Sequence, residues 1–176
     1  TVGAALPVIK TIQDLILSGD KIYKIKAVLS GSLNFIFNKY DNTNTFAEVV
    51  KLAGDEGYTE PDPLIDLSGV DVMRKILILS REAGYKLEMS DVTARPFLPE
   101  SCLKAASYDI LFEELKANEA HFRKLYKSAI EKGNKLKVVA SFENAKAFVA
   151  LEEVVSSSPF FHLEGKDNIV SIKMKY

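Results

Sequence analysis

Apolar residues recur at helical spacing in the first part of the chain and then change to alternation. Residues 8–16 carry apolar side chains every three or four positions, and residues 18–20 (Ser-Gly-Asp) interrupt them. We therefore expect a helix after Pro7, which suits its first turn. Residues 21–30 alternate between apolar and polar side chains, as in a strand with one buried face. Residues 30–32 (Ser-Gly-Ser) then lead into a second apolar helix.

Local signals mark the ends of the helices that follow. Residues 45–48 (Thr-Phe-Ala-Glu) have the spacing of a capping box, so a helix should run from there to about residue 55. Gly57 stands where a left-handed residue usually ends a helix. Residues 62–63 (Asp-Pro) have the order of an N-cap followed by a first helical position. They predict one long helix that reaches residue 84.

The second half of the chain combines amphipathic helices with strand patterns. Residues 107–132 are rich in Leu, Phe, Ala, Glu and Lys, which predicts one or two helices. Strand-like runs occupy residues 136–142, 147–154 and 169–174, and residues 143–146 suit a hairpin turn between the first two. The elements together favour an α+β fold, with a mixed, largely antiparallel sheet and helices packed on one face.

Composition excludes several classes of protein. The chain has 176 residues and is 47% hydrophobic, which fits one compact domain over residues 1–176. Its net charge of −1 gives no electrostatic basis for binding nucleic acid or an anionic membrane surface. No apolar run approaches the roughly 18 residues that a membrane span needs. Cys102 is the only cysteine, which excludes an internal disulfide, so we expect a cytoplasmic protein.

The candidate chemistry is concentrated between residues 57 and 75, where carboxylates and a lysine lie among turn residues. Glu60, Asp62 and Asp66 each have an alternative that needs no ligand. Asp62 suits a helix N-cap, because Pro63 follows it. Asp66 would be favoured at the positive end of a helix dipole, and Glu60 would be stable as a solvated loop acid.

Asp71 and Lys75 have the i,i+4 spacing that places two side chains on one helical face. Surface ion pairing is the alternative to catalysis for such a pair. The neighbouring positions are almost all apolar, however, so the pair should be partly desolvated. Gly69 interrupts the same helical pattern, and a glycine inside a helix often marks a break or the close approach of a ligand.

This combination of groups suits a substrate that is both an amino acid and an alcohol. The substrate ammonium needs carboxylates such as Glu60 and Asp66. Its hydroxyl, which loses a proton as hydride leaves the same carbon, needs a positioned acid/base such as Lys75. Asp71 would hold that lysine in place.

The same residues closely resemble the signature of the homoserine dehydrogenase family. The resemblance covers the chain nearly end to end and is specific, because the motifs follow the family's order and spacing. The matching motifs are Val2-Gly3-Ala4-Ala5-Leu6-Pro7-Val8-Ile9, Ser30-Gly31-Ser32-Leu33-Asn34-Phe35-Ile36, Gly57-Tyr58-Thr59-Glu60-Pro61-Asp62-Pro63, Asp66-Leu67-Ser68-Gly69, Asp71, Arg74-Lys75, Ser158-Pro159-Phe160 and Gly165-Lys166-Asp167-Asn168.

The resemblance implies an oxidoreductase that interconverts L-homoserine and L-aspartate 4-semialdehyde with NAD or NADP, in threonine, methionine and isoleucine biosynthesis. Lys75 matches the catalytic acid/base of the family, and Asp71 matches its companion at the reacting oxygen. Glu60 matches the carboxylate that binds the homoserine amino group. The same pocket in the family also includes the residues that match Gly57, Tyr58 and Asp66.

A monovalent-cation site is also implied, because the family binds an ion such as sodium through backbone near Val2, Ala4 and Leu6. The acidic side chain of that site falls before Thr1. The family further implies a homodimer formed through the sheet, and some members are fused to an aspartate kinase.

The 176 residues lack the nucleotide-binding motif of the family. No Gly-x-Gly-x-x-Gly turn occurs in the 176 residues, and a dinucleotide pyrophosphate needs such a loop before a helix. We therefore expect the isolated chain to be a substrate-binding and dimerisation domain without dehydrogenase activity of its own. The alternative functions are a regulatory or dimerisation module that binds an amino acid without chemistry, and a purely structural interaction domain.

Overall fold

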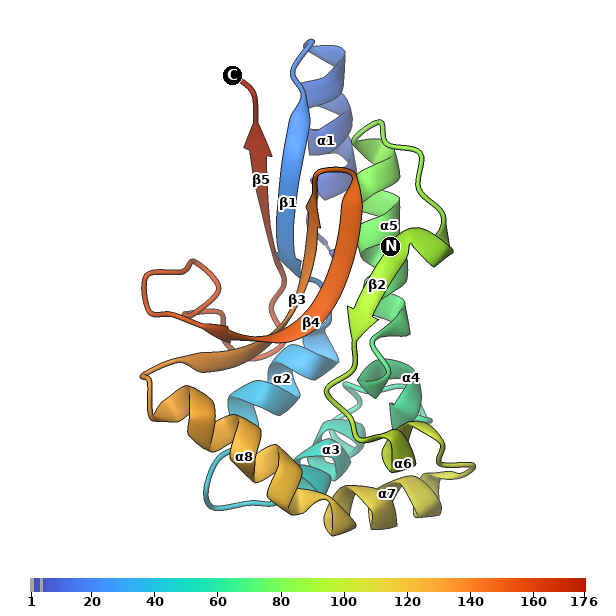
Figure 1. The fold of residues 1–176 in the computed structure, drawn as a ribbon, viewed down its shortest axis with the longest axis vertical. Coiled ribbons are helices and arrows are strands. Elements are labelled where there is room, and N and C mark those ends of the chain that lie inside the picture. Colours follow the sequence, from blue (N-terminus) through green and yellow to red (C-terminus); the bar gives the residue numbers. More distant parts are fainter. Residues whose placement is uncertain (1, 4) are drawn as a thin grey trace.

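The computed structural model describes residues 2–3 and 5–176, in which the strands form a mixed sheet (Figure 1). The strand order is β2-β4-β3-β1-β5. Neighbouring strands are antiparallel except β2 and β4, which run parallel. The strands are β1 (Ile22–Val28), β2 (Val92–Arg95), β3 (Lys135–Glu143), β4 (Lys146–Val154) and β5 (Ile169–Met174).

The helices form two groups around the sheet, and the predicted α+β class is confirmed. Helix α5 packs on β2, β3 and β4, and α1 packs on α5. Other helices, including α2, α3 and α8, gather at one end of the sheet (Figure 1). The α-helices are α1 (Val8–Leu17), α2 (Gly31–Lys39), α3 (Phe46–Asp55), α4 (Pro63–Leu67), α5 (Val70–Glu82), α6 (Glu100–Leu103), α7 (Tyr108–Ala117) and α8 (Glu119–Ile130); a 3₁₀ turn spans Met89–Asp91.

The local signals in the sequence act where they were expected. The Thr45 hydroxyl accepts a hydrogen bond from the Glu48 backbone, and the Glu48 carboxylate accepts one from the Thr45 backbone. Asp62 caps α4 by accepting from the backbone N–H of Leu64 at 3.0 Å, with Pro63 next in the chain. In the β3–β4 hairpin, Asn144 and Ala145 have φ angles of 52° and 57°. This left-handed pair is the geometry that matches strand twist in a two-residue turn.

Two expectations about the elements are wrong. The single helix expected over residues 62–84 is divided into α4 and α5, because Gly69 has a φ of 73° and caps α5 in the left-handed conformation. Strand β2 was not among the strands that the sequence predicted. It is only four residues long and carries one buried side chain, Val92, so its pattern is too short to be recognised.

Both faces of the sheet carry buried residues near its centre. The main core includes Ile25, Ala27 and the helices, as the alternation in β1 predicted. Val28, on the opposite face, is also buried. It packs with Val139 and Val154 of the sheet and with Phe160, which belongs to residues 155–168. We call residues 155–168 the β4–β5 loop. No helix in the described part of the chain is long and apolar enough to span a bilayer.

The break at Gly69 provides a test of the fold. Replacement of Gly69 by alanine should lower the free energy of unfolding by about 1–2 kcal/mol, because a side chain is disfavoured at a positive φ. Urea titration followed by circular dichroism measures the change.

Gly54→Ala is the matched control. Gly54 lies inside α3, where an added Cβ would meet only Thr59 Oγ1, at 3.5 Å. That variant should be more stable than the parent by up to about 1 kcal/mol, since alanine is the better helix former. Equal effects of the two substitutions would contradict the assignment of Gly69 as a left-handed break.

Candidate functional site

Every residue that was expected to act in catalysis or substrate binding lines one cavity. The cavity has a volume of about 430 Å³ and lies where α2, the α3–α4 connection, α5 and the β4–β5 loop meet. Its lining consists of Ser30, Gly31, Ser32, Gly57, Tyr58, Glu60, Asp66, Asp71, Lys75, Lys166 and Asn168. A lysine and several carboxylates therefore line one cavity, as we expected for a site that binds an amino acid with a hydroxyl group.

Lys75 is held in the cavity wall by two fixed partners. Its Nζ lies 2.5 Å from Asp71 Oδ2 and donates to the carbonyl oxygen of Leu29 at 3.0 Å. The Lys75 side chain is 21% exposed and that of Asp71 is 47% exposed. The predicted i,i+4 pair on α5 is therefore confirmed and is partly desolvated. An ammonium has three N–H donors, so one remains for a ligand oxygen.

Asp66 organises the wall of the cavity. Its Oδ1 accepts from the Ser32 hydroxyl at 2.7 Å, and its Oδ2 accepts from the Glu60 backbone N–H at 2.8 Å. Ser32 Oγ is in turn 2.9 Å from Ser30 Oγ. Each carboxylate oxygen of Asp66 thus already has a protein donor. Its direct part in substrate binding is still a prediction, and its visible role is to fix the loop that carries Glu60.

Glu60 and Tyr58 occupy the connection between α3 and α4. Gly57 has a φ of 71° and turns the chain out of α3, as its position predicted. The Tyr58 ring packs against Phe35, with ring centroids 4.7 Å apart. The Glu60 backbone is tied to Asp66, whereas Glu60 itself is exposed at the mouth of the cavity. Its carboxylate is thus accessible to a cation from solvent.

The β4–β5 loop supplies two lining residues that the sequence did not assign to the site. Lys166 and Asn168 belong to the motif that resembles the family, but their distance in sequence from residues 57–75 concealed their position. The loop passes so close to α2 that a Cβ on Gly31 would lie 2.8 Å from the Lys166 carbonyl oxygen. Glycine at position 31 is thus required for this approach.

A buried lysine holds the same loop. Lys137 on β3 is fully buried, and its Nζ donates to Asn34 Oδ1 at 2.7 Å, Asn38 Oδ1 at 2.6 Å and the Leu163 carbonyl at 2.6 Å. Burial, aided by the neighbouring charge of Lys135, lowers the pKa of Lys137 from 10.5 to about 8. All three acceptors are neutral, so this charge is stabilised by oriented dipoles rather than by an ion pair.

The expected cation site lies only partly within the described residues. Ala4 is outside them, so the backbone group that it was expected to supply is not placed. Val2 is buried, and Leu6 donates its backbone N–H to the Gly3 carbonyl at 3.0 Å. Among the described residues no cluster of three histidine, cysteine or acidic side chains has the arrangement of a metal site. Binding of a monovalent cation is still a prediction.

The described residues do not fit a nicotinamide nucleotide. Their one parallel strand pair is β2 and β4, and β2 leads through Pro96 and Pro99 into the four-residue helix α6. Glu100 begins that helix, where its charge would oppose a pyrophosphate. The strand, glycine-rich turn and helix N-terminus that bind a dinucleotide are therefore not found in the part of the chain that is described.

Comparison with known proteins agrees with this architecture. The family model described as homoserine dehydrogenase matches residues 7–176. The bifunctional aspartokinase/homoserine dehydrogenase 2 of Escherichia coli is 42% identical over 178 residues, which cover 100% of this chain and 22% of that protein. A bifunctional aspartokinase/homoserine dehydrogenase of maize is 39% identical, covering 97% of this chain and 19% of that protein. The chain thus spans about a fifth of these relatives.

Solved structures give the same result for the fold. A Candida auris protein of unknown function is 36% identical with a TM-score of 0.91, over 99% of this chain and 51% of that one. A homoserine dehydrogenase from Thiobacillus denitrificans is 22% identical with a TM-score of 0.75, over 99% of this chain and 37% of that one. The α+β fold of the chain agrees with these matches. The chain belongs to the homoserine dehydrogenase family.

The burial of Lys137 leads to a prediction about how the stability of the fold depends on pH. The pKa of Lys137 is about 8 in the folded state and near 10.5 when unfolded, so between these values the unfolded chain binds more protons. The parent chain should therefore gain stability relative to Lys137→Met as the pH rises from 8 to 10.5. Urea titrations across this range measure the difference.

The exposed Lys127 provides the control, because Lys127→Met removes a lysine charge without changing a buried site. The curves of stability against pH for Lys127→Met and the parent should stay parallel. Parallel curves for Lys137→Met would show that Lys137 keeps its ordinary affinity for a proton, contrary to its surroundings.

Proposed function

We propose that this chain is the substrate-binding and catalytic part of an enzyme that interconverts L-homoserine and L-aspartate 4-semialdehyde. The observation that carries the proposal is the position of Lys75. Its ammonium is fixed by Asp71 and the Leu29 carbonyl, and it lines the same cavity as the accessible carboxylate of Glu60. One wall therefore offers a proton-transfer group for a hydroxyl, and another offers an anion for an ammonium.

In this proposal Lys75 manages the proton of the reacting oxygen. In the oxidation, Lys75 must begin as the neutral amine, so that Nζ can take the proton of the substrate hydroxyl as the carbon–hydrogen bond is broken. In the reverse direction, the Lys75 ammonium returns that proton to the aldehyde oxygen. Asp71 orients the amine throughout and offsets its charge. The overall reaction also needs NAD or NADP as hydride carrier, which residues outside this chain would bind.

Glu60 binds the substrate ammonium in the proposal. Its backbone is fixed by Asp66, so the carboxylate is presented at the mouth of the cavity at a low entropic cost. Gly57 and Tyr58 shape the same wall. The enzyme would act in threonine, methionine and isoleucine biosynthesis, in the cytoplasm. The names of the relatives favour a parent polypeptide that also contains an aspartate kinase.

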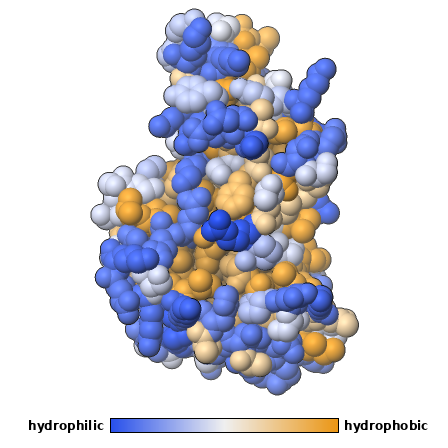
Figure 2. All heavy atoms as spheres, viewed as in Figure 1, coloured by the Kyte–Doolittle hydropathy of each residue, from blue (hydrophilic) through white to orange (hydrophobic). Residues whose placement is uncertain are grey.

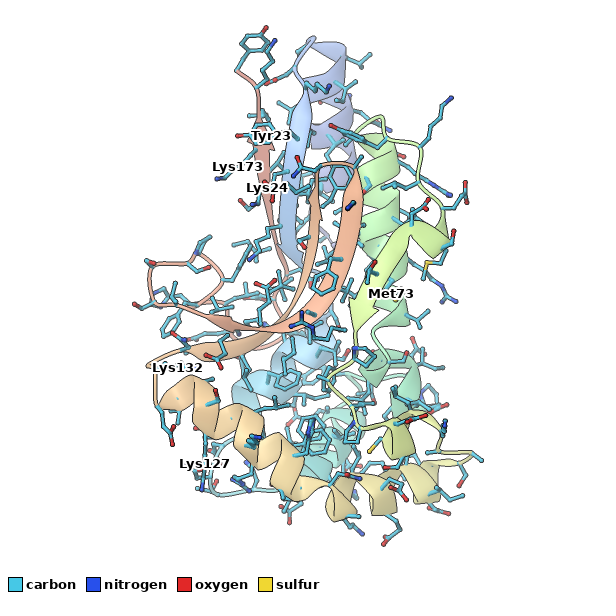
Figure 3. The ribbon with its side chains drawn as sticks, in the orientation of Figure 1. Tyr23, Lys24, Met73, Lys127, Lys132 and Lys173 are labelled. Atoms are coloured by element: carbon cyan, nitrogen blue, oxygen red, sulfur yellow. The ribbon has the colours of Figure 1, made fainter. Side chains whose placement is uncertain are left out.

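Substitution of Lys75 tests the proposal. In the complete polypeptide that carries these residues, Lys75→Ala should lower kcat by about 10²–10⁴, the usual contribution of one acid/base group. Steady-state oxidation of L-homoserine, followed by nicotinamide absorbance, measures the loss. Lys127→Ala, which lies on the outer side of α8, is the control and should keep the parent rate (Figure 3).

Retention of turnover by Lys75→Ala would reject the catalytic role of the cavity. Altered regulation by an amino acid together with intact turnover would instead favour a sensory module. If Glu60→Gln loses homoserine binding but keeps its stability, the result would support the proposal that the cavity binds the amino acid.

We also propose that the chain forms a homodimer through the sheet face that α1 and α5 leave open. Phe148 on β4 is half-buried on this face, between Thr93 on β2 and Ser141 on β3. In the view of Figure 2, hydrophobic residues reach the surface near the centre, where Figure 1 places β4 and β2, and a strongly hydrophilic group lies among them. The Arg95 guanidinium lies over the Phe148 ring, 5.7 Å from its centroid. Aromatic side chains and arginine are enriched at interfaces between subunits.

Sedimentation velocity tests the dimer. Phe148→Asp should shift the protein from dimer to monomer, because it removes an aromatic ring from the interface and puts in its place a carboxylate that must be desolvated. Leu17→Asp places the same charge at an 82% exposed site at the end of α1 and should leave the dimer intact. A dimer that persists in Phe148→Asp would exclude this face.

A further inference from the structure

The proposed substrate carries a carboxylate for which the roles assigned so far provide no cation. The charged residues around the cavity are Glu60, Asp66, Asp71, Lys75 and Lys166. Lys75 is already bound to Asp71 and is assigned to the substrate hydroxyl. Lys166 is therefore the cation in this lining that has no assigned role. A zwitterion in a cavity with an excess of carboxylates needs such a group, because its own carboxylate would otherwise be repelled.

The Lys166 ammonium lies against the wall formed by Tyr58. Its Nζ is 4.8 Å from the centroid of the Tyr58 ring, within the range of a cation–π contact. The ring neither neutralises the charge nor uses up its N–H donors in strong hydrogen bonds. Lys166 is exposed, so its ammonium is open to an anion that enters the cavity.

Asn168 adds an acceptor two residues further along the loop. Its Oδ1 is buried and has no hydrogen-bond partner within the described residues. A buried polar atom without a partner costs about 1–3 kcal/mol, so a ligand donor that reaches it would bind favourably. The ammonium of an amino acid is such a donor, and Glu60 lines the same cavity.

The loop that carries both residues is held in place before any ligand binds. The Asn34 side-chain amide donates to the carbonyls of Glu164, Gly165 and Asp167 at 3.3, 3.1 and 3.2 Å. The Asn38 amide donates to the carbonyls of Leu163 and Gly165 at 3.2 and 3.3 Å. Lys137 adds its bond to the Leu163 carbonyl. These contacts attach residues 163–167 to α2, so little ordering entropy is left for the ligand to supply.

We propose that Lys166 binds the α-carboxylate of the amino-acid substrate, and that Asn168 shares the substrate ammonium with Glu60. The inference rests on the proposed function. It adds the residue that recognises the substrate carboxylate, which is the group that distinguishes an amino acid from a simple amino alcohol. Lys166 acts in binding alone, because Lys75 lies at the reacting oxygen and Lys166 at the opposite end of the substrate.

Kinetics of the complete polypeptide test the inference. Lys166→Met should raise KM for L-homoserine about 10- to 100-fold with kcat within twofold of the parent, the usual scale for one charge-assisted hydrogen bond. Lys166→Arg should restore KM to within a few-fold, because it keeps the charge. Lys127→Met is the control and should not change either constant.

An inhibitor without the carboxylate separates this role from a general loss of structure. The inhibition constant of 3-aminopropan-1-ol, which lacks only the carboxylate of homoserine, should be unchanged by Lys166→Met. An unchanged KM for homoserine, or an equal weakening of both molecules, would overturn the role of Lys166. If Lys166→Met leaves KM unchanged while Lys75→Ala is inactive, only this inference is overturned. If Lys75→Ala retains turnover, the proposed function itself is overturned.

Discussion

The site depends on one constraint, which is that the ammonium of Lys75 must stay at the edge of an apolar core. Helix α5 packs on three strands, and Lys75 lies at the edge of this packed side, where its side chain is only 21% exposed. Asp71 and the Leu29 carbonyl together compensate the partial loss of water around the amine. Leu29 directly follows β1, so the position of the lysine is tied to the sheet as well as to its own helix.

The carboxylates around the cavity differ in role because their surroundings differ. Asp71 lies one turn before Lys75 and faces it. Asp66 accepts hydrogen bonds from the Ser32 hydroxyl and the Glu60 backbone, so it shapes the wall. Glu60 is exposed and keeps its carboxylate for a cation. Residue type alone would treat the three acids alike, whereas their partners and their exposure to solvent differ.

Much of the fold and part of the site follow from local signals in the sequence. Caps, glycines and periodicity predicted most elements, and the i,i+4 spacing predicted the Asp71–Lys75 pair, because these depend on neighbours in the chain. Strand β2 was missed because its four residues are placed by pairing with β4. Lys166 and Lys137 were missed for the same reason. Their partners are far away in sequence, and no local pattern records such contacts.

The cavity is assembled from distant parts of the chain. The amide of Asn34 contacts the Asp167 carbonyl across 133 positions of sequence. During synthesis on the ribosome, helices α2 to α5 emerge long before the loop that closes the cavity. The loop residues that complete the pocket wall are thus synthesised last among the lining residues, after the β3–β4 hairpin. A nascent chain truncated directly after β4 would carry Lys75 and Asp71 but lack the β4–β5 loop that completes the cavity wall.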